Sequence, residues 1–217
     1  MTTDPKPFVI TIARSFGSGG KYIGTQLSQK LNIPCYDDEL KRILEEQSGI
    51  HNKHFQNMEE NFDLPFWLQK LRKKPVSEYV VSPHEDRFLS DVGLYKMQAK
   101  LLNELASSES YVVMGKCANH VLRQRNNVMS IHVSASLASC KESICKKLGA
   151  PPEEAEKLIL KTDRYRREYY QYYSEGKKWD SPLEYDFMLN SSRLGRDTCV
   201  EMILGHIKRK FGVSPTE

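Results

Sequence analysis

The stretch Phe8-Val-Ile-Thr-Ile-Ala-Arg-Ser-Phe-Gly-Ser-Gly-Gly-Lys21-Tyr-Ile-Gly24 runs from an apolar segment through three glycines and a lysine. The apolar segment is typical of a buried strand. Apolar residues at spacings of three and four then predict a helix from about Gly20 to Leu31. Glycine permits positive φ angles and lets a ligand approach the backbone closely. A strand, a glycine-rich turn and a helix in this order predict a phosphate-binding loop.

The chemistry of such a loop lies mainly in its backbone. Unpaired N–H groups and the positive end of the helix dipole favour a phosphate, and Lys21 adds a mobile cation beside the β- and γ-phosphates. Against the pattern G-x-x-x-x-G-K-[ST], Gly20 and Lys21 fit, whereas Ser15 replaces the first glycine and Tyr22 replaces the Mg²⁺-binding hydroxyl residue. The alternative is a glycine-rich turn that merely links a strand to a helix. The residues predicted to bind the donor phosphates are Ser15, Gly17, Ser18, Gly19, Gly20, Lys21 and Tyr22.

Strand and helix patterns alternate along the rest of the chain. Buried strands are predicted at Phe8–Ala13, Pro34–Tyr36, Tyr111–Gly115, Val128–Ala135 and Phe187–Asn190. Helices are predicted at Thr25–Leu31, Asp38–Gln47, Asp91–Ser107, Ala118–Arg125, Leu137–Leu148, Glu153–Tyr173 and Arg196–Phe211. This alternation predicts an α/β fold with a parallel sheet between two helical layers, and with the carboxyl ends of the strands at one edge. We expect ligands to bind at that edge.

Two segments interrupt the alternation within what we expect to be a single domain of residues 1–217. The segment at 48–90 is rich in proline and aromatic residues, and it is predicted to be a compact insert on the acceptor side. The segment at 151–182 is charged and rich in tyrosine. A mobile lid has this composition, and a solvated helical hairpin is an equally good interpretation.

Basic residues of the lid segment are candidates for catalysis. Phosphoryl transfer requires positive charge around the transferred group and little covalent work by the protein. Arg164, Arg166 and Arg167 offer planar guanidinium groups, which bind phosphate oxygens bidentately. On a helix, Arg166 projects away from Arg164 and Arg167, so it is expected to pair with Asp163 or Glu168. The alternative is a solvated charged face. Together with Lys21, the three arginines are the predicted catalytic residues.

Two further residues are predicted to bind the acceptor. Lys116 follows the Tyr111–Gly115 strand at the ligand edge, where it is placed to bind a phosphate. Asp37 and Asp38 follow the short Pro34–Tyr36 strand, where a carboxylate can reach an acceptor or Mg²⁺, and one of them is expected to cap the next helix. His51 and His54 lack partners at metal-site spacing, so no residue is assigned as a metal ligand.

Composition restricts the classes of function. The chain has 217 residues, 39% of them hydrophobic, and a formal net charge of +4, which suits an anionic ligand without requiring nucleic acid. Its five cysteines are scattered, which argues against a disulfide framework and against a thiolate zinc site. No apolar run approaches the length of about 18 residues that a membrane span needs, so we expect a cytoplasmic protein. The basic and aromatic run from Tyr165 to Tyr173 favours helix packing over stacking on RNA bases.

Five blocks taken together are similar to the cytidylate kinase-like family of P-loop proteins. They are Ala13-Arg-Ser-Phe-Gly-Ser-Gly-Gly-Lys-Tyr-Ile-Gly24, Ile33-Pro-Cys-Tyr-Asp37, Val112-Val-Met-Gly-Lys-Cys-Ala118, Asp163-Arg-Tyr-Arg-Arg-Glu-Tyr-Tyr170 and Tyr185-Asp-Phe-Met-Leu-Asn-Ser-Ser-Arg-Leu-Gly195. The resemblance implies a P-loop three-layer sandwich with a five-stranded parallel sheet, a helical acceptor-side insert and a lid. It also implies transfer of the γ-phosphoryl group of ATP, with Mg²⁺, to CMP, dCMP or a related nucleoside monophosphate.

Carried over by position, the resemblance implies that Gly17 to Lys21 hold the donor phosphates while Arg164, Arg166 and Arg167 close over them. Lys116 stands where the family usually has an arginine that addresses the acceptor. Cytidylate kinases also carry a hydroxyl residue near Tyr22 and an acidic residue near Met114, so here Mg²⁺ is expected to be held mainly by phosphates and water. The rival hypothesis is a non-catalytic nucleotide-binding module, a degenerate kinase.

Overall fold

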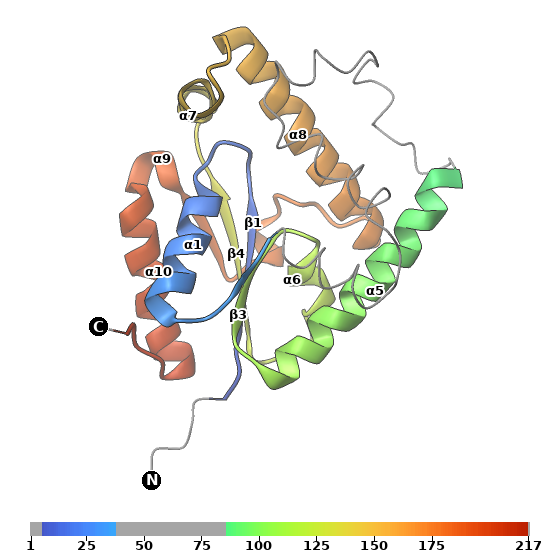
Figure 1. The fold of residues 1–217 in the computed structure, drawn as a ribbon, viewed down its shortest axis with the longest axis vertical. Coiled ribbons are helices and arrows are strands. Elements are labelled where there is room, and N and C mark those ends of the chain that lie inside the picture. The colour runs from blue at the N-terminus through green and yellow to red at the C-terminus, as the bar shows by residue number, and fades with distance from the viewer. Residues whose placement is uncertain (1–5, 38–85, 217) are drawn as a thin grey trace.

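Five parallel strands form the centre of the protein in a computed structural model, which describes residues 6–37 and 86–216, with side chains described from 6 to 37 and from 95 to 216. The strands are β1 (Val9–Arg14), β2 (Cys35–Tyr36), β3 (Tyr111–Met114), β4 (Val128–Ser134) and β5 (Phe187–Asn190). They lie in the order β2-β3-β1-β4-β5 (Figure 1). The α/β fold with a five-stranded parallel sheet is therefore confirmed, and each strand lies within two residues of its predicted bounds.

The central strand β1 pairs with β3 on one side and with β4 on the other. Its register with β3 runs from Val9↔Tyr111 to Ile12↔Met114, and its register with β4 extends to Arg14↔Val133. The branched and apolar side chains of these strands are almost wholly buried, as in a sheet that is covered on both faces. Because all five strands run in the same direction, Arg14, Asp37 and Gly115 come to the same edge of the sheet.

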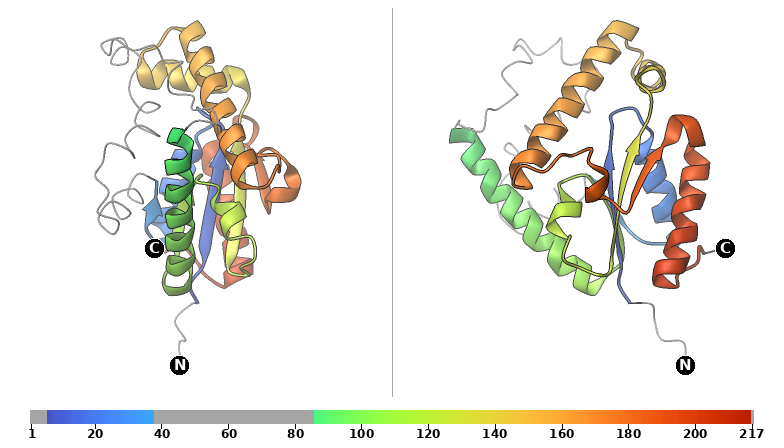
Figure 2. Two further views of the ribbon diagram at one scale, coloured as in Figure 1. Left: turned by 90° about the vertical axis from the view of Figure 1, so that its right-hand side faces the viewer. Right: turned by 180° about the vertical axis from the view of Figure 1, so that it is seen from behind.

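Helices cover both faces of the sheet (Figures 1 and 2). On one face, α1 (Gly20–Leu31) and α10 (Arg196–Phe211) pack Ile23, Leu27 and Ile203 against β1. On the other face lie α5 (Asp86–Ser108) and α6 (Ala118–Val121), with Leu101 and Leu102 of α5 buried against the sheet. Alternate residues of β1 therefore belong to two different cores.

A helical hairpin extends beyond the carboxyl edge of the sheet. It consists of α7 (Leu137–Leu148) and α8 (Pro152–Tyr173), and it holds a small apolar cluster of its own that includes Ile144, Ala155 and Ile159. Ser136 caps α7 by accepting a hydrogen bond from the Ser139 N–H group. Figure 2 shows α8 running from the tip of this hairpin down toward α5 and α6. The lid segment of the sequence corresponds to α8 and the chain that follows it.

Several boundaries differ from the predictions. The α6 helix ends at Val121 rather than Arg125, because the next residues form turns in which Arg123 donates a hydrogen bond to the carbonyl of His120. The α5 helix begins at Asp86, five residues before the predicted start. Sequence patterns did not predict α9 (Ser191–Leu194) or the 3₁₀ turn Pro182–Glu184, which are too short to show a period.

Some predictions lie outside the described residues, namely the helix at Asp38–Gln47, most of the insert at 48–90, and the capping of that helix by Asp37 or Asp38. The five cysteines are all described and none forms a disulfide, as their scatter predicted. Within residues 6–37 and 86–216, none of the helices combines the length and apolarity that a bilayer-crossing segment requires.

Candidate functional site

The phosphate loop, defined here as residues 15–21, has the backbone conformation that its glycines permit. Gly17 and Gly19 adopt φ angles of 85° and 83°, in the left-handed region. A Cβ atom on Gly17 would lie 2.8 Å from the carbonyl oxygen of Cys140, so conformation and space both exclude a side chain there. Gly20 does not share the positive φ, because it is the first residue of α1. Because Gly20 has no side chain, the side chain of Arg14 can pack against it. A Cβ atom built on Gly20 would lie 2.5 Å from the Cβ atom of Arg14.

Hydrogen bonds from the neighbouring chain hold the phosphate loop. The N–H group of Ser15 donates to the carbonyl of Val133 (3.0 Å), and the hydroxyl of Ser191 donates to the carbonyl of Ser18 (2.5 Å). The first i to i−4 hydrogen bond of α1 joins Ile23 N–H to Gly19 (3.0 Å). The N–H groups of Gly20, Lys21 and Tyr22 therefore have no acceptor within the helix, as an anion-binding helix start requires.

A cluster of charged side chains lies beside the loop. This edge cluster consists of Arg14, Lys21, Asp37 and Lys116, which come from the ends of β1, α1, β2 and β3. Lys21 Nζ is 3.1 Å from Asp37 Oδ2, and Arg14 Nη2 is 3.4 Å from Asp37 Oδ1. Burial raises the pKa of Asp37, but Arg14, Lys21 and Lys116 together outweigh burial and hold that pKa below its ordinary value. Asp37 is therefore a carboxylate that three cations keep ionised.

The backbone after β3 is strained where it enters the edge cluster. Gly115, Lys116 and Cys117 adopt φ angles of 68°, 59° and 56°, and the side chain of Gln98 donates to the carbonyl of Lys116 (3.1 Å). A Cβ on Gly115 would lie 2.3 Å from Arg14 Nη1. Consecutive left-handed residues are costly and often mark functional sites. Arg14 and Gly115 were not predicted as site residues, although they directly precede the predicted site residues Ser15 and Lys116.

The lid helix α8 contacts the start of the phosphate loop. Asp163 Oδ1 accepts a hydrogen bond from the N–H group of Phe16 (2.8 Å), and Arg166 Nη1 donates to the carbonyl of Arg14 (2.9 Å). The predicted pairing of Arg166 with Asp163 is confirmed at 3.5 Å. Burial raises the pKa of Asp163, and Arg166 and the Phe16 N–H group only partly oppose that rise. Asp163 lies in one of the blocks that carry the family resemblance, but no pattern in the sequence predicted its role.

The other two lid arginines lie away from the loop. Arg167 pairs with Asp180 (3.6 Å) and lies over the ring of Trp179 (5.8 Å from its centroid). Arg164 is exposed, and within the described residues the structure gives its side chain no partner. Of the three, within the described residues, only Arg166 contacts the loop, where its guanidinium group lies over the ring of Phe16 (5.6 Å from its centroid).

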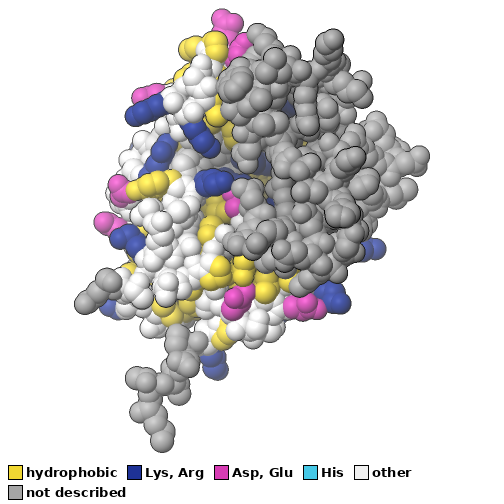
Figure 3. Space-filling model, in the orientation of Figure 1, with side chains coloured by type: hydrophobic (Ala, Val, Ile, Leu, Met, Phe, Trp, Pro, Cys, Tyr) yellow, Lys and Arg dark blue, Asp and Glu magenta, His cyan; other side chains and the backbone are white. Residues whose placement is uncertain are grey.

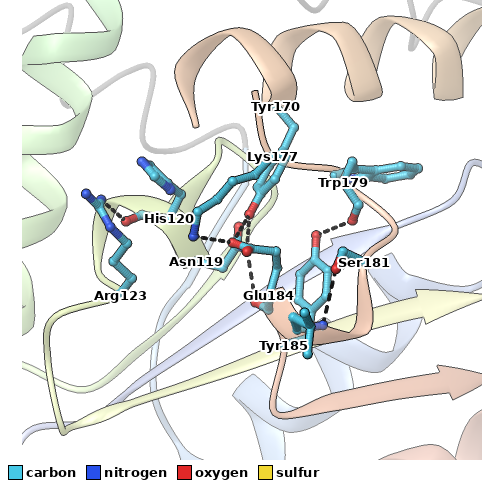
Figure 4. Close-up of polar contacts among 10 residues, drawn as sticks. Asn119, His120, Arg123, Tyr170, Lys177, Trp179, Ser181, Glu184 and Tyr185 are labelled. Atoms are coloured by element: carbon cyan, nitrogen blue, oxygen red, sulfur yellow. Dashed lines mark hydrogen bonds and ion pairs between the residues drawn. The ribbon is translucent and has the colours of Figure 1, made fainter. Parts of the chain in front are cut away.

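The carboxyl-terminal end of α8 is anchored in the core. Figure 4 shows Asn119 of α6 donating to the hydroxyl of Tyr170 (2.9 Å), which in turn donates to Glu184 (3.0 Å), and Lys177 pairs with the same carboxylate (3.0 Å). Around this network a cluster of buried side chains packs under α8. Its members are Ala13, Cys117, Tyr170, Tyr173, Trp179 and Tyr185. Tyr170 and Tyr173 of α8 thus pack within the protein, as their spacing favoured, whereas Tyr172 is 46% exposed.

Tyr22 does not block the phosphate loop. Its hydroxyl donates to Asp197 of α10 (2.6 Å), and 40% of the residue is exposed. Met114, which stands near the acidic position of cytidylate kinases, is wholly buried and packs close to Gly24. Neither side chain offers an oxygen atom to a metal ion at the loop.

Comparison with solved structures shows what the fold resembles. An uncharacterized protein from Eubacterium ventriosum is 23% identical, with a TM-score of 0.67 over 93% of this chain and 98% of that one. Shikimate kinase from Bacteroides thetaiotaomicron is 13% identical, with a TM-score of 0.50 over 93% and 98% of the two chains. A gluconokinase from Sinorhizobium meliloti is 13% identical, with a TM-score of 0.50 over 96% and 95%. These similarities show a P-loop kinase fold.

Comparison of sequences identifies the family. A search of curated proteins returns no significant match. The model of the cytidylate kinase-like family matches residues 9–193, which include the phosphate loop, the edge cluster and α8. This match covers most of the chain, so the protein belongs to the cytidylate kinase-like family.

Proposed function

We propose that the protein is an ATP-dependent phosphotransferase that moves the γ-phosphoryl group of ATP to a nucleoside monophosphate such as CMP or dCMP. The observation that carries this proposal is the phosphate loop. Its left-handed glycines and the N-terminal turn of α1 lie beside the side chain of Lys21, whose Nζ atom is 3.1 Å from Asp37 Oδ2 at the sheet edge. Family membership supports phosphoryl transfer as the class of reaction.

Each group has a role in this proposal. The backbone of Gly17 to Lys21 binds the donor phosphates, and Lys21 shifts from Asp37 to the β- and γ-phosphates when ATP binds. Asp37 and Lys116 face the acceptor from the ends of β2 and β3. Arg164, Arg166 and Arg167 supply positive charge from the lid, with Arg166 already at the loop.

The loop has the chemistry that the phosphates of ATP require, because it joins left-handed glycines to the N-terminus of α1, where backbone N–H groups favour an anion. The bare backbone at Gly17 and Gly20 accommodates Cys140 and Arg14. Mg²⁺ is a different case. Tyr22 is engaged by Asp197 and Met114 is apolar, so the nucleotide phosphates and water would supply most of the ligands of that ion. Mg²⁺ would neutralise charge on the transferred group, and Asp37 is the single carboxylate of the edge cluster as defined above.

The test is ADP formation from ATP with a panel of nucleoside monophosphates. We expect turnover with at least one of them, and a loss of about 10²- to 10³-fold in kcat for Lys21→Ala, the typical effect of removing one transition-state contact. The matched control is Lys30→Ala at the opposite end of α1, where the side chain is exposed. Equal background rates for the wild type and Lys21→Ala across the panel would reject catalysis.

A second candidate is a non-catalytic nucleotide-binding module. It is favoured by the engagement of Tyr22 with Asp197 and by the buried thioether of Met114, since neither residue can hold a metal ion. Calorimetric titration separates the two functions. Tight binding of ATP without Mg²⁺, combined with no turnover, supports the module. Binding that needs Mg²⁺ together with ADP formation supports the kinase.

A further inference from the structure

The turn after β3 brings Lys116 to the sheet edge through an unfavourable backbone. Gly115, Lys116 and Cys117 are three consecutive residues in the left-handed region, and two of them carry a side chain. For residues other than glycine this conformation is costly, and it persists only where the surrounding structure fixes it. The contacts that hold the backbone of this turn therefore determine where Lys116 lies.

Local hydrogen bonds hold both ends of the turn. The carbonyl of Gly115 accepts from the N–H group of Ala118 (3.0 Å), and the carbonyl of Cys117 accepts from N–H groups of α6 (3.0 Å). The carbonyl between them is bound from another element, because the side chain of Gln98 of α5 donates to the Lys116 oxygen (3.1 Å). The main chain of Lys116 is thus anchored to α5.

Gln98 is a polar residue on a buried face of its helix. It is 7% exposed, and it lies three and four residues before Leu101 and Leu102, which pack against the sheet. A buried amide is unfavourable unless it is hydrogen-bonded, and the bond to the Lys116 oxygen satisfies one of its donors. An apolar residue of the same length would fill the space but leave that oxygen without this donor.

A second contact joins α5 to the same turn. Tyr95 lies three residues before Gln98, and its phenol is hydrogen-bonded to the thiol of Cys117. The ring of Tyr95 also stacks on Tyr173 of α8, with 3.9 Å between the centroids and 19° between the planes. Burial raises the pKa of the Cys117 thiol to about 12, so this thiol stays neutral. One face of α5 therefore contacts two successive residues of the turn.

The turn holds the charge of Lys116 near the phosphate loop. Lys116 lies close enough to Asp37 to lower the pKa of that carboxyl group, together with Arg14 and Lys21. Figure 3 shows Lys or Arg side chains next to an acidic one near the middle of the molecule. A group that binds a substrate must be held within about 0.5 Å of its productive position by its neighbours. For Lys116, the neighbours that do this are on α5.

We propose that Gln98 and Tyr95 are positioning residues, which fix the left-handed turn and so hold Lys116 in place for the phosphoryl acceptor. This inference rests on the proposed function, because that function assigns the acceptor to Lys116. Gln98 acts through the main chain of Lys116, and Tyr95 acts through Cys117. Loss of either hydrogen bond should weaken binding of the acceptor and leave binding of the donor nucleotide unchanged.

The test is a double-mutant cycle on equilibrium binding, measured by calorimetry with CMP, UMP, GMP and AMP in the presence of a non-hydrolysable ATP analogue. Gln98→Met keeps the length of the side chain and removes the donor. It should weaken the tightest-binding monophosphate by about 3- to 10-fold, the range for one neutral hydrogen bond, and leave the affinity for the ATP analogue unchanged. Lys116→Met should cause a larger loss. Adding Gln98→Met to Lys116→Met should cause no further loss, because Gln98 acts through Lys116.

Alkylation of Cys117 reports on the turn without any ligand. The residue is 5% exposed, so iodoacetamide should modify its thiol slowly in the wild type. Gln98→Met and Tyr95→Phe should each raise the rate of modification at Cys117 by about 3- to 10-fold, measured by mass spectrometry of peptides. Thermal unfolding of each variant detects a general loss of structure. Tyr95→Phe removes a single hydroxyl group and keeps the proposal testable if Gln98→Met does not fold.

The matched control is Asn103→Leu. It removes an amide-to-carbonyl hydrogen bond of the same kind within α5, from Asn103 to Ala99 (3.0 Å). This variant should change neither the affinity for the monophosphate nor the alkylation of Cys117.

Several results would overturn the proposal. It is wrong if the wild type binds none of the monophosphates, or if the losses of Gln98→Met and Lys116→Met add in the double variant. It is also wrong if Gln98→Met leaves either the affinity or the alkylation of Cys117 unchanged, or weakens the ATP analogue as strongly as the monophosphate. None of these measurements requires turnover, so a failure of ADP formation rejects the proposed function without deciding this proposal.

Discussion

The phosphate loop and the edge cluster lie side by side at the carboxyl end of the sheet but are built by different means. The loop consists of consecutive residues, and its shape depends on left-handed glycines at 17 and 19 and on hydrogen bonds to main-chain atoms. The edge cluster unites side chains from four separate elements through charge. The loop therefore depends on steric fit, and the cluster depends on electrostatic balance.

This difference has consequences for mutation. A change in the loop acts through backbone strain and collision, which salt does not relieve. A change in the edge cluster acts through charge, which depends on protonation and on whichever anion is bound. The lid helix α8 touches both regions, because Asp163 holds the Phe16 N–H group and Arg166 holds the carbonyl of Arg14.

The largest effect is expected at Gly17. Gly17→Ala places a side chain at a φ of 85° and 2.8 Å from the carbonyl oxygen of Cys140. The strain alone costs about 1–3 kcal/mol, and the collision adds to it. Urea unfolding measures the loss of stability. The matched control is Gly176→Ala, with a φ of 89° and no heavy atom within 4 Å of its Cβ, which should show the strain alone. Equal losses at the two glycines would contradict a loop governed by steric fit.

A smaller effect is expected at Asp163. Asp163→Ala leaves the Phe16 N–H group and Arg166 without their acceptor, at a cost of about 1–3 kcal/mol. Asp163→Asn keeps an oxygen for the N–H group, so it should lose less stability and retain more affinity for an ATP analogue. The control is Glu156→Gln, which also alters a carboxylate of α8 but removes its ion pair with Lys141 of α7 and leaves the contacts to Phe16 and Arg166 in place. If all three variants bind the analogue equally well, α8 does not position the loop.

The dependence of stability on pH is expected to differ between the core, through His132, and the edge cluster, through Asp37. The pKa of His132 falls to about 4 because it is buried, so the native protein holds His132 neutral while the unfolded chain takes up a proton below its ordinary value of 6.5. Stability should therefore fall as pH drops below 6.5, by about 1.4 kcal/mol per pH unit. Asp37, whose pKa is lowered, stays ionised throughout this range.

Urea unfolding at pH 7.5 and pH 5.5 checks the contribution of His132. His132→Phe should remove most of the pH dependence, because the residue is 2% exposed and packs against the rings of Trp179 and Tyr185. His206→Gln, at a partly exposed position of α10, serves as the control and should leave the dependence intact. If His132→Phe loses as much stability between pH 7.5 and pH 5.5 as the wild type does, another group is responsible for the pH dependence.

The smallest effect is expected at Tyr22. Tyr22→Phe removes only an exposed hydrogen bond to Asp197 and keeps the main-chain N–H group that is predicted to face the phosphates. Neither the melting temperature nor the affinity for the ATP analogue should change measurably. A clear loss of Mg²⁺-dependent affinity would show that the phenol takes part in binding and that the loop does not act through its backbone alone.

Sequence patterns predicted most of the fold. All five strands were predictable because apolar residues in a sheet covered on both faces form continuous runs. The short helix α6 was predicted too long, because the periodic pattern continues into turns that Arg123 stabilises. Arg14 and Asp163 were not selected, because an arginine at a strand end and an acid in a charged helix are ordinary in sequence. Their roles emerge only from partners far along the chain.

The sequence by itself determined the phosphate loop, because the freedom of a glycine backbone and the order of strand, turn and helix are local properties. Only the tertiary structure decided which charges meet. Arg14, Asp37 and Lys116 are distant in sequence and come together because β1, β2 and β3 end at the same edge. It also decided that Arg166, of the three lid arginines, reaches the loop, since the packing of α8 against the core fixes the direction in which each side chain points.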